Sequence, residues 1–460
     1  MMNKVSADLI ARLRAIVGEK QVLEGDAIGA DYAHDELPGG AAHMPEAVVV
    51  ANSAETVAEV LKLCGEAGVA VTVRGAGTGR AGGSVPVNGG VVLSLKEMNS
   101  ILSFDETART LTVQPGVLLQ DVKAEAEKHG LYYPPDPGEK TATIGGNAST
   151  NAGGPCAVKY GSTRDYVADA VVVLADGSIS RISENSALSA VLGSEGTLGV
   201  ITELTLKLVE KPVCDVILFL PFMDAESCIN AAIKLRESDF APAILEYLDT
   251  DMVEFSGNVT GNPIFPIEMD GERVGATLML TIEGANDDEL DEKMEAVAEL
   301  AEELECLDIL VVDTPTLKRD TWDAHDAFHT STETAKSEDE LNVNVPAENM
   351  AELVAFAKAQ GEEKGLKVLT YGHVGSGGLH IHVLSDSGKA EFAPVMAELA
   401  GAVYAKCAEL GGSIDGEYGV GYAKKAYLKA ALSEEQYAKL TAEKAAFDPK
   451  GILNPGKITD

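Results

Sequence analysis

The sequence predicts an α+β protein in which two different domains follow one another along the chain. Residues Glu46–Val50 and Val69–Val73 are apolar runs of strand length on either side of a helical pattern, which indicates a βαβ unit. Beyond about residue 212, strands and helices alternate in an order typical of an antiparallel sheet covered by helices. A chain of 460 residues, 45% of them hydrophobic, can bury two or three domain cores.

The first of these domains is expected to be built around short strands and two helices. Its last part contains a third glycine-bearing turn that runs into a strand. The expected elements are a helix from the N-cap Ser53 to about Glu66, strands at Val91–Leu95 and Leu111–Val113, a helix at Leu118–His129, a hairpin of Ala170–Leu174 and Ile179–Ile182, and a strand within Leu192–Leu208.

Lys211-Pro212 marks the expected start of the second domain. Its strands and helices predict an antiparallel sheet with the helices packed on one face. The expected elements are strands at Val216–Leu220, Ala243–Leu248 and Ala276–Ile282, and helices at Asp224–Arg236 and Asp287–Glu305.

The composition excludes several classes of protein. A formal net charge of −37 argues against binding to nucleic acid or to an anionic membrane. Six scattered cysteines without a CxxC pair exclude a disulfide framework and an iron–sulfur site built from this chain alone. No apolar run reaches the roughly 20 residues that span a bilayer, and the N-terminus lacks a signal peptide, so a cytoplasmic protein without a transmembrane segment is expected. An anionic substrate would need local positive charge, from a metal or a basic residue.

Two glycine-rich segments carry the strongest functional signal. Val73–Pro86 and Pro134–Tyr166 are dense in Gly, Thr, Ser and Asn, and backbone N–H groups in such loops can converge on a bound anion. Two loops of this kind indicate a large cofactor that carries phosphate. The GxGxxG match at residues 77–82 follows a strand, but no helix is expected to begin there. A Rossmann-type dinucleotide site is therefore rejected.

A hairpin that carries histidines is the second signal. Val368–His373 and Leu379–Leu384 are apolar runs joined by a glycine-rich loop, which predicts that His373 and His380 face each other. His380 and His382 are two residues apart and so share one face of their strand. Two imidazoles on rigid strands, together with one carboxylate, make a credible site for a divalent metal.

Six motifs occur in a fixed order along the chain. They are RGAGTGRAGG, PPDPGEKTATIGGNASTNAGG with KYGSTRDYV, GSEGTLGVIT, YGHVGSGGLH, GEYGVG and DPKGILNPGK. In this order they resemble the FAD-linked oxidases of the vanillyl-alcohol oxidase type, in the branch of D-lactate dehydrogenase, glycolate oxidase large subunit and D-2-hydroxyglutarate dehydrogenase. The resemblance implies an FAD-binding domain at 41–212, a cap or substrate domain with an antiparallel sheet at 213–411, and a C-terminal segment at 412–460 that returns to the flavin. Residues 1–40 are expected to form a helical segment, because the N-terminus alternates apolar and charged residues as a short amphipathic helix does.

The resemblance also implies which residues hold FAD. Small residues let the flat ring lie against the backbone, and Asn and Thr bond to its edges; alternatively, Asn147 and Asn151 only cap turns. Relatives that bind flavin covalently have a His or Cys near these loops. Between His43 and His129 there is no His, and Cys156 is a weak candidate, so non-covalent FAD is expected. The implied contacts are Gly75, Gly77, Thr78 and Gly79 at the pyrophosphate, Pro137, Thr143, Gly146, Asn147, Asn151, Gly153, Glu195, Gly199, Ile201 and Thr202 around the cofactor, and Asn454 at the flavin.

The metal-dependent branch has its third ligand in a GE(H)G motif, whose Glu is Glu417 here. The resemblance therefore implies Zn, Fe or Mn held by His373, His380 and Glu417. The family's His after this Glu, which acts as the base, is Tyr418 in this chain. A phenol is a poor base at neutral pH unless a metal or cation lowers its pKa. Either Tyr418 acts as such a phenolate, or another group such as His382 is the base.

Three further positions concern the substrate. The family's Trp-x-x-Arg holds the substrate carboxylate through its Arg, and His325 stands there in this chain. Either His325 replaces the Arg with weaker charge, or substrate binding has moved. The hairpin turn has Ser376 and Gly378 where the family often has Asp and Asn. Lys424 keeps the family's basic position, and either helps to hold an anion or is a surface lysine.

The activity implied is that of an FAD-dependent dehydrogenase for a small D-2-hydroxy acid, with D-lactate as the first expectation. The metal favours the alkoxide, a base takes the proton, and the C2 hydride passes to flavin N5. Because the chain shows no second redox site, electrons should leave to a quinone, an iron–sulfur subunit or an electron-transfer flavoprotein. The alternatives are a dehydrogenase for another hydroxy acid, such as glycolate or D-2-hydroxyglutarate, and a non-catalytic flavin-relay subunit.

Overall fold

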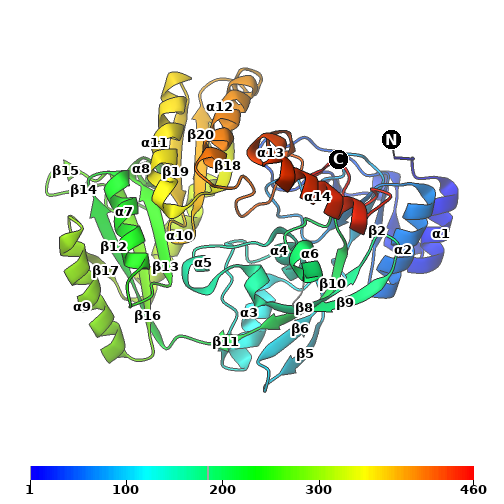
Figure 1. Cartoon of the computed structure of the whole chain (residues 1–460), viewed down its shortest axis with the longest axis horizontal. Helices are drawn as coiled ribbons and strands as arrows, with labels where there is room; N and C mark the ends of the chain where they lie inside the picture. The colour runs from blue at the N-terminus through cyan, green and yellow to red at the C-terminus, as the bar shows by residue number, and fades with distance from the viewer. Residues whose placement is uncertain (1, 184–185, 460) are drawn as a thin grey trace. The chain divides into compact units, whose positions relative to one another are not determined.

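The computed structural model describes residues 2–183 and 186–459, which form two compact units (Figure 1). The first unit contains Met1–Gly153, Ser162–Glu210 and Tyr418–Asp460, and the second contains Gly154–Gly161 and Lys211–Glu417. The chain thus enters the second unit twice and returns to the first for its last residues. The four consecutive segments expected from the sequence stay a prediction of domain limits.

A four-stranded sheet with helices packed against it forms one part of the first unit. Its order is β1-β2-β4-β3; β4 pairs in parallel with β2 and β3, and β1 is antiparallel to β2. Ser53 caps the second helix by accepting a hydrogen bond from the backbone N–H of Thr56, as predicted. Leu453 bridges to Val71 of β3 and joins the same apolar core, so the C-terminal segment is part of this layer. The elements are α1 (Ala7–Val17), η1 (Glu19–Gln21), β1 (Val22–Leu23), η2 (Gly25–Ala27), η3 (Ala30–Ala33), β2 (Ala47–Val50), α2 (Ala54–Ala67), β3 (Val71–Arg74) and β4 (Val91–Ser94).

A five-stranded antiparallel sheet, in the order β5-β6-β10-β8-β9, forms the other part of this unit. The predicted hairpin around Asp176-Gly177 is confirmed, because β8 and β9 pair across that turn. The elements are β5 (Ile101–Asp105), β6 (Thr110–Val113), α3 (Leu119–Lys128), β7 (Leu131–Tyr132), α4 (Ile144–Thr150), η4 (Thr163–Tyr166), β8 (Val167–Val173), β9 (Ile179–Ser183), α6 (Ser186–Val191), β10 (Val200–Lys207), β11 (Val209–Glu210), α13 (Lys425–Ala431) and α14 (Glu434–Phe447).

The second unit is built on a seven-stranded antiparallel sheet in the order β17-β12-β16-β13-β19-β20-β18. The predicted strands and helices of this half of the chain are all present. The elements are α5 (Ala157–Tyr160), β12 (Cys214–Phe222), α7 (Ala225–Arg236), β13 (Ile244–Asp249), α8 (Thr250–Thr260), β14 (Glu268–Met269), β15 (Glu272–Arg273), β16 (Ala276–Gly284), α9 (Asp287–Glu303), β17 (Leu310–Val312), α10 (Pro315–Thr332), β18 (Ser337–Asn344), α11 (Ala347–Glu363), β19 (Lys367–Gly372), β20 (Gly378–Ser385) and α12 (Lys389–Glu409).

The expectation that helices cover only one face of this sheet is wrong. Helices α8 and α10 pack together over one face, where Met252 and Phe328 share an apolar cluster with Phe219 and Tyr371 of the sheet. Helices α7, α9, α11 and α12 pack beside one another over the other face (Figure 1). The reason is visible in β12, whose residues from Val216 to Phe222 are all buried, since a strand covered on one face only would alternate.

Among the described residues, no helix combines the length and the apolar character needed to cross a membrane.

Candidate active site

The histidine hairpin of the second unit is formed by β19 and β20, which pair with Tyr371 opposite His380. His373 follows β19 by one residue, and its Nε2 lies 3.5 Å from Nε2 of His380. The predicted facing pair is therefore present, and both rings are buried. The ring of Tyr371 stacks on His380 and on His382, with centroids 4.5 and 5.8 Å away, so these two histidines share one strand face as predicted.

Glu417 brings a carboxylate to the same place. Its Oε1 lies 3.2 Å from His373 Nε2, and its Oε2 lies 4.0 Å from His380 Nε2. The backbone N–H of Gly154 donates to Glu417 Oε1 at 2.8 Å, and the N–H of Glu417 donates to Asn342 Oδ1 at 2.6 Å. One donor atom from each of the three side chains lies within 4.8 Å of the others. Two imidazoles and a carboxylate form a donor set that fits a divalent cation such as zinc.

Each histidine of this trio has its second ring nitrogen on a buried carboxylate. His373 Nδ1 lies 2.6 Å from Glu246 Oε1, and His380 Nδ1 lies 2.9 Å from Glu340 Oε1. An imidazole whose Nδ1–H donates to a carboxylate presents its Nε2 lone pair on the other side. Both rings therefore direct Nε2 toward Glu417, which is the orientation a metal ligand needs.

The electrostatics keep the carboxylates ionised. Burial alone would raise the pKa of Glu417, but without a bound cation the positive charge of protonated His373 and hydrogen bonds outweigh it and lower that pKa to about 2. Glu246 and Glu417 in turn raise the pKa of His373 against the effect of its burial, so a cation would bind Nε2 in exchange for that proton. Glu246 responds in the same way: burial opposes ionisation, while His373 and His325 lower its pKa to about 2. Burial lowers the pKa of His380 to about 4, so this ring is neutral at neutral pH and able to act as a ligand.

The glycine-rich loops lie in the first unit, except for Gly154–Gly161 of the second loop, which belongs to the second unit. After β3 the chain runs through residues 75–90 without a helix, which confirms that no Rossmann-type turn is present. The backbone of Gly75 lies directly against the N-cap of α4, because a Cβ there would approach Thr143 Oγ1 to 2.2 Å. Gly82 has a φ of +78° and lies against the ring of Tyr422. A side chain would not fit at Gly75 or Gly82, so at these two points the loop consists of backbone alone and its amide groups are not covered by a side chain of their own.

Two polar side chains tie the loops together. The carboxylate of Glu195 accepts hydrogen bonds from the backbone N–H groups of Val420 (2.6 Å) and Gly421 (2.8 Å). Asn454 Nδ2 donates to the carbonyl oxygens of Glu195 (2.5 Å) and Gly83 (3.3 Å), while its Oδ1 accepts from the N–H of β3 residue Val73. These hydrogen bonds hold the first and third glycine-bearing segments and the C-terminal segment in one arrangement.

Several buried polar atoms of the first unit have no hydrogen-bond partner among the described residues. They include Nδ2 of Asn147 on α4 and Oγ of Ser194 in the third glycine-bearing turn. Buried polar groups are almost always paired in folded proteins. A bound cofactor with hydrogen-bonding edges would supply such partners, so this loop region fits FAD.

Comparison with known proteins decides the family. The family described as "FAD binding domain" matches residues 45–183, and "FAD linked oxidases, C-terminal domain" matches residues 211–458, more than half of the chain. The chain belongs to the FAD-linked oxidase family. FAD is therefore its cofactor, and it is an oxidoreductase.

Relatives of this oxidoreductase cover its whole length. It is 42% identical to a D-lactate dehydrogenase of Anaerostipes hadrus, over 99% of this chain and 98% of the relative. It is 33% identical to the glycolate oxidase subunit GlcD of Bacillus subtilis, over 99% of this chain and 97% of that one. Among solved structures, p-cresol methylhydroxylase has a TM-score of 0.81 at 20% identity, over 98% of this chain and 96% of the other, and so supports the fold. The α+β fold of the vanillyl-alcohol oxidase type is confirmed.

The structure brings four of the expected FAD contacts together through direct interactions. These are Gly75, Thr143, Glu195 and Asn454, as described above. Asn151 ends α4 with a φ of +54°, and its Oδ1 accepts from Ser162 and Arg164, so it caps a turn, as the alternative reading expected. Three more pack within the five-stranded sheet: Thr202 Oγ1 donates to a β8 carbonyl, Gly199 lies against Val172, and Ile201 is buried in β10. None of these contacts within the protein decides a role toward FAD, so the roles of all these residues, and of Gly77, Thr78, Gly79, Pro137, Gly146, Asn147 and Gly153, stay predictions.

The expected catalytic residues are divided between the units. Tyr418 belongs to the first unit, where the guanidinium of Arg80 lies 5.9 Å from its ring centroid. Lys424, in the same unit, is buried, so the alternative of a surface lysine is wrong. His382 is fully buried in the second unit, with Nδ1 3.3 Å from Glu338 Oε1.

His325 lies behind the metal-site histidines. Its ring is buried, and its Nε2 is 3.2 Å from Glu246 Oε2, the carboxylate that also orients His373. His325 is thus placed to support Glu246, and its expected part in holding a substrate carboxylate stays a prediction.

Sequence reasoning missed the acidic residues behind the site. Glu246 is a single charge in the apolar strand β13, and Glu338, Glu340 and Asn342 alternate along β18. Both patterns are signals that could have been used, because a charge on a buried strand requires a partner. His329, in the last turn of helix α10, was also missed; its Nδ1 lies 3.5 Å from Glu340 Oε2.

Proposed function

We propose that the protein is an FAD-dependent dehydrogenase that oxidises a small D-2-hydroxy acid, with D-lactate as the main substrate, to the 2-oxo acid. The observation that carries the proposal is the convergence of His373 Nε2 and His380 Nε2 on the carboxylate of Glu417. The relative named D-lactate dehydrogenase supports the choice of substrate.

The metal ligands in this proposal are His373, His380 and Glu417, with Zn, Fe or Mn as the cation. When bound, the cation favours ionisation of the substrate hydroxyl and FAD accepts the hydride. The protein supplies geometry: Glu246 and Glu340 hold the rings, and the N–H of Gly154 holds Glu417.

Two groups are proposed as the base. His382 has its Nδ1 near Glu338 and Thr332, which leaves Nε2 as the proton acceptor. Tyr418 lies near the guanidinium of Arg80, whose positive charge would favour a phenolate. Replacement of each by Phe, with the rate of flavin reduction as the readout, separates the two.

FAD is proposed to bind without a covalent bond, along the glycine-bearing segments of the first unit. Electrons then pass to a partner, either an electron-transfer flavoprotein, an iron–sulfur subunit or a quinone. The relative named as a subunit of glycolate oxidase supports a protein partner.

Anaerobic reduction of the bound flavin tests the proposal. The oxidised protein is mixed with D-lactate, L-lactate, glycolate and D-2-hydroxyglutarate in turn, and the flavin absorbance is followed. D-lactate should reduce the flavin fastest and L-lactate should not react. Faster reduction by glycolate would favour the alternative function of a glycolate dehydrogenase, which the relative named glycolate oxidase subunit GlcD supports. If only a chemical reductant bleaches the flavin, the dehydrogenase proposal is wrong, and the alternative of a non-catalytic flavin-relay subunit is favoured.

A further inference from the structure

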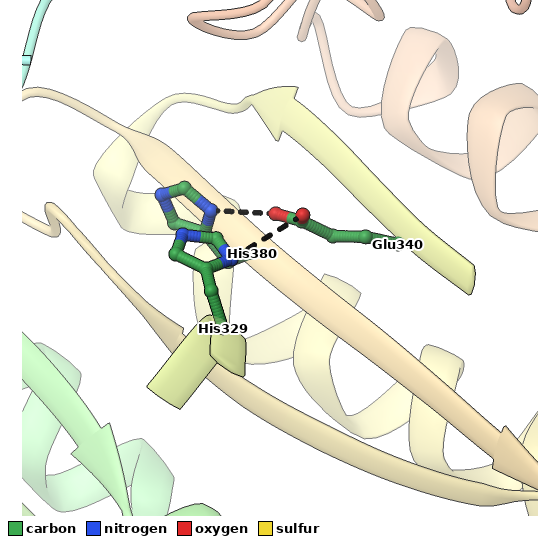
Figure 2. Close-up of side chains that lie close together, drawn as sticks. All are labelled: His329, Glu340 and His380. Atoms are coloured by element: carbon green, nitrogen blue, oxygen red, sulfur yellow. Dashed lines mark hydrogen bonds and ion pairs between the residues drawn. The ribbon is translucent and has the colours of Figure 1, made fainter. Parts of the chain in front are cut away.

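A second cluster of imidazole and carboxylate groups lies next to the trio described above. Figure 2 shows His329, Glu340 and His380 with the carboxylate of Glu340 bonded to both rings. Glu340 Oε1 lies 2.9 Å from His380 Nδ1, and its Oε2 lies 3.5 Å from His329 Nδ1. One donor atom from each of the three lies within 4.8 Å of the others. None of these contacts involves Glu417 or His373.

His382 adds a third imidazole to this side of Glu340. Its Nε2 lies 3.9 Å from Glu340 Oε1, and its ring centroid lies 5.2 Å from that of His329. Glu340 is buried on β18, opposite His382 on β20, so strand register places the carboxylate and this ring side by side. His329 reaches the same point from helix α10, and its side chain is 28% exposed, which gives the cluster an opening.

In both His329 and His382, one ring nitrogen lies near Glu340 and the other, called the far nitrogen here, has a different partner that orients the ring. His329 Nε2 lies 2.6 Å from the hydroxyl of Tyr371, and His382 Nδ1 lies 3.3 Å from Glu338. The rings of the first trio are held in the same way by Glu246 and Glu340. A ring whose far nitrogen carries the proton offers its near nitrogen as a metal ligand.

We propose that a second divalent cation binds beside the first, with His329 Nδ1, Glu340 and His382 Nε2 as its ligands. A cation on His382 Nε2 would take the lone pair that a base needs, so this inference assigns the base to Tyr418 rather than to His382. His380 is not a ligand of this second site, because its Nε2 faces the first one and its remaining proton is donated to Glu340 from Nδ1. Ligand atoms about 2.0–2.2 Å from a tetrahedral cation are about 3.3–3.6 Å apart, close to the separations of 3.5 and 3.9 Å found here.

The charge of the site favours a second cation. Glu340 is a buried carboxylate whose neighbours include three imidazoles, and a divalent ion would balance it without protonating those rings. The hydrogen bond between His380 and Glu340 would then link the two cations. In a chain with a net charge of −37, a second cation also adds local positive charge for an anionic substrate.

Metal counting tests the second site. The FAD-containing protein is stripped with a chelator and dialysed against buffered Zn²⁺, and zinc per chain is measured by mass spectrometry. Two ions per wild-type chain are expected. His329→Ala should bind one, His373→Ala should bind one, and the double variant should bind none above background.

A matched control is His129→Ala. His129 is a partly exposed histidine with a carboxylate neighbour, Glu125, 3.4 Å away, and it lies in the first unit outside both clusters. This variant should still bind two ions. If His329→Ala is poorly folded by circular dichroism, His329→Gln retains a polar side chain beside Tyr371 and should also bind one ion.

A wild-type chain that binds one ion, or a His329→Ala chain that still binds two, would overturn the inference. The count does not depend on the substrate, so it can fail while the dehydrogenase proposal stands. In the same way, a protein that oxidises no hydroxy acid can still bind two ions.

Discussion

At the scale of single residues, the carboxylates behind the histidines matter as much as the histidines themselves. A neutral imidazole binds a metal only through the nitrogen that lacks a proton, so the partner of the other nitrogen sets which way the ring is used. Glu246 does this for His373, and Glu340 does it for His380. The orientation of the candidate metal ligands is thus built into the second unit of the protein.

Replacing Glu246 by Gln should weaken Zn²⁺ binding about 10- to 100-fold, because the isosteric amide cannot hold the Nδ1–H of His373 as a carboxylate does. Competition with a chromophoric chelator measures the change. Glu268→Gln, at an exposed position of β14 in the same unit, is the matched control and should bind as the wild type does. Equal zinc affinity in wild type and Glu246→Gln would contradict the orienting role.

Lys457 gives a prediction for pH. It is 1% exposed, and burial lowers its pKa from 10.5 to about 7, opposed by the charge of Glu195. The native state therefore binds fewer protons than the unfolded state between pH 7 and 10.5, and the stability of the wild type rises with pH in that window. Lys457→Met removes this dependence. We expect the variant to be more stable than the wild type at pH 7, by at most about 5 kcal/mol, with the advantage shrinking toward pH 10.

Thermal unfolding of the FAD-free proteins across this pH range measures the effect, with Lys4→Met as an exposed control. A difference between Lys457→Met and wild type that stays constant with pH would show that Lys457 does not titrate in this window.

The sequence allowed the proximity of His373 and His380 to be predicted, but not the carboxylates that orient them. His373 and His380 are seven residues apart in one hairpin, so local pattern was enough to pair them. Glu246 lies 127 residues before His373 in the chain and meets it only through the sheet. Contacts of that kind depend on strand order and register, which a single sequence does not reveal. Asn151 was expected at FAD, and its turn-capping bonds likewise became visible only in the fold.

At the scale of elements, the turn between β19 and β20 places His373. Gly377 in this turn has a φ of +91°, and a Cβ there would approach the carbonyl oxygen of Val345 to 2.4 Å. Gly365, which precedes β19, has a φ of +67° but nothing within 4 Å of its Cβ position. Alanine at Gly365 would therefore meet only the unfavourable positive φ, whereas alanine at Gly377 would meet the positive φ and a steric clash as well.

Gly365→Ala should cost about 1–2 kcal/mol, the cost of a left-handed alanine. Gly377→Ala should cost at least about 2 kcal/mol more, because a backbone carbonyl must also move, and it should weaken zinc binding by displacing His373. Denaturant unfolding and zinc competition measure the two effects. Equal losses of stability in the two variants would contradict the steric role of Gly377.

Strands and helices were predicted well where the chain carried clear caps and turns, such as Ser53 and Asp176-Gly177. The number of covered sheet faces was predicted wrongly, although β12 contains a continuous apolar run from Val216 to Phe222. Continuous burial along a strand indicates a sheet covered on both faces, whereas alternating burial would indicate a sheet covered on one face only. The hydrophobic pattern of this strand was thus present in the sequence, but it was interpreted as that of a strand buried on one face.

At the scale of the whole molecule, the net charge of −37 is the dominant electrostatic feature. Like charges repel one another in the compact state, and salt screens this repulsion as the Debye length falls from about 30 Å at 0.01 M to about 8 Å at 0.15 M. We therefore expect the melting temperature to rise by several degrees over that range of sodium chloride. Differential scanning calorimetry tests this, and a melting temperature that falls with salt would show that favourable ion pairs outweigh the net repulsion.

The two units divide the chemistry of the protein between them. Most of the glycine-bearing segments that fit FAD belong to the first unit, whereas His373, His380 and Glu417 belong to the second, together with Gly154–Gly161. Glu417 is the last residue of the second unit, and Tyr418 begins the segment that returns to the first. We therefore propose that flavin and cation serve the same oxidation.

Rapid-mixing kinetics of flavin reduction test this claim most directly. The anaerobic, FAD-containing protein is mixed with D-lactate as purified, after metal removal by a chelator, and after Zn²⁺ or Mn²⁺ is restored. The account predicts fast flavin reduction that falls at least about 100-fold without metal and recovers when metal is returned. Undiminished reduction in protein shown to be free of metal would contradict it.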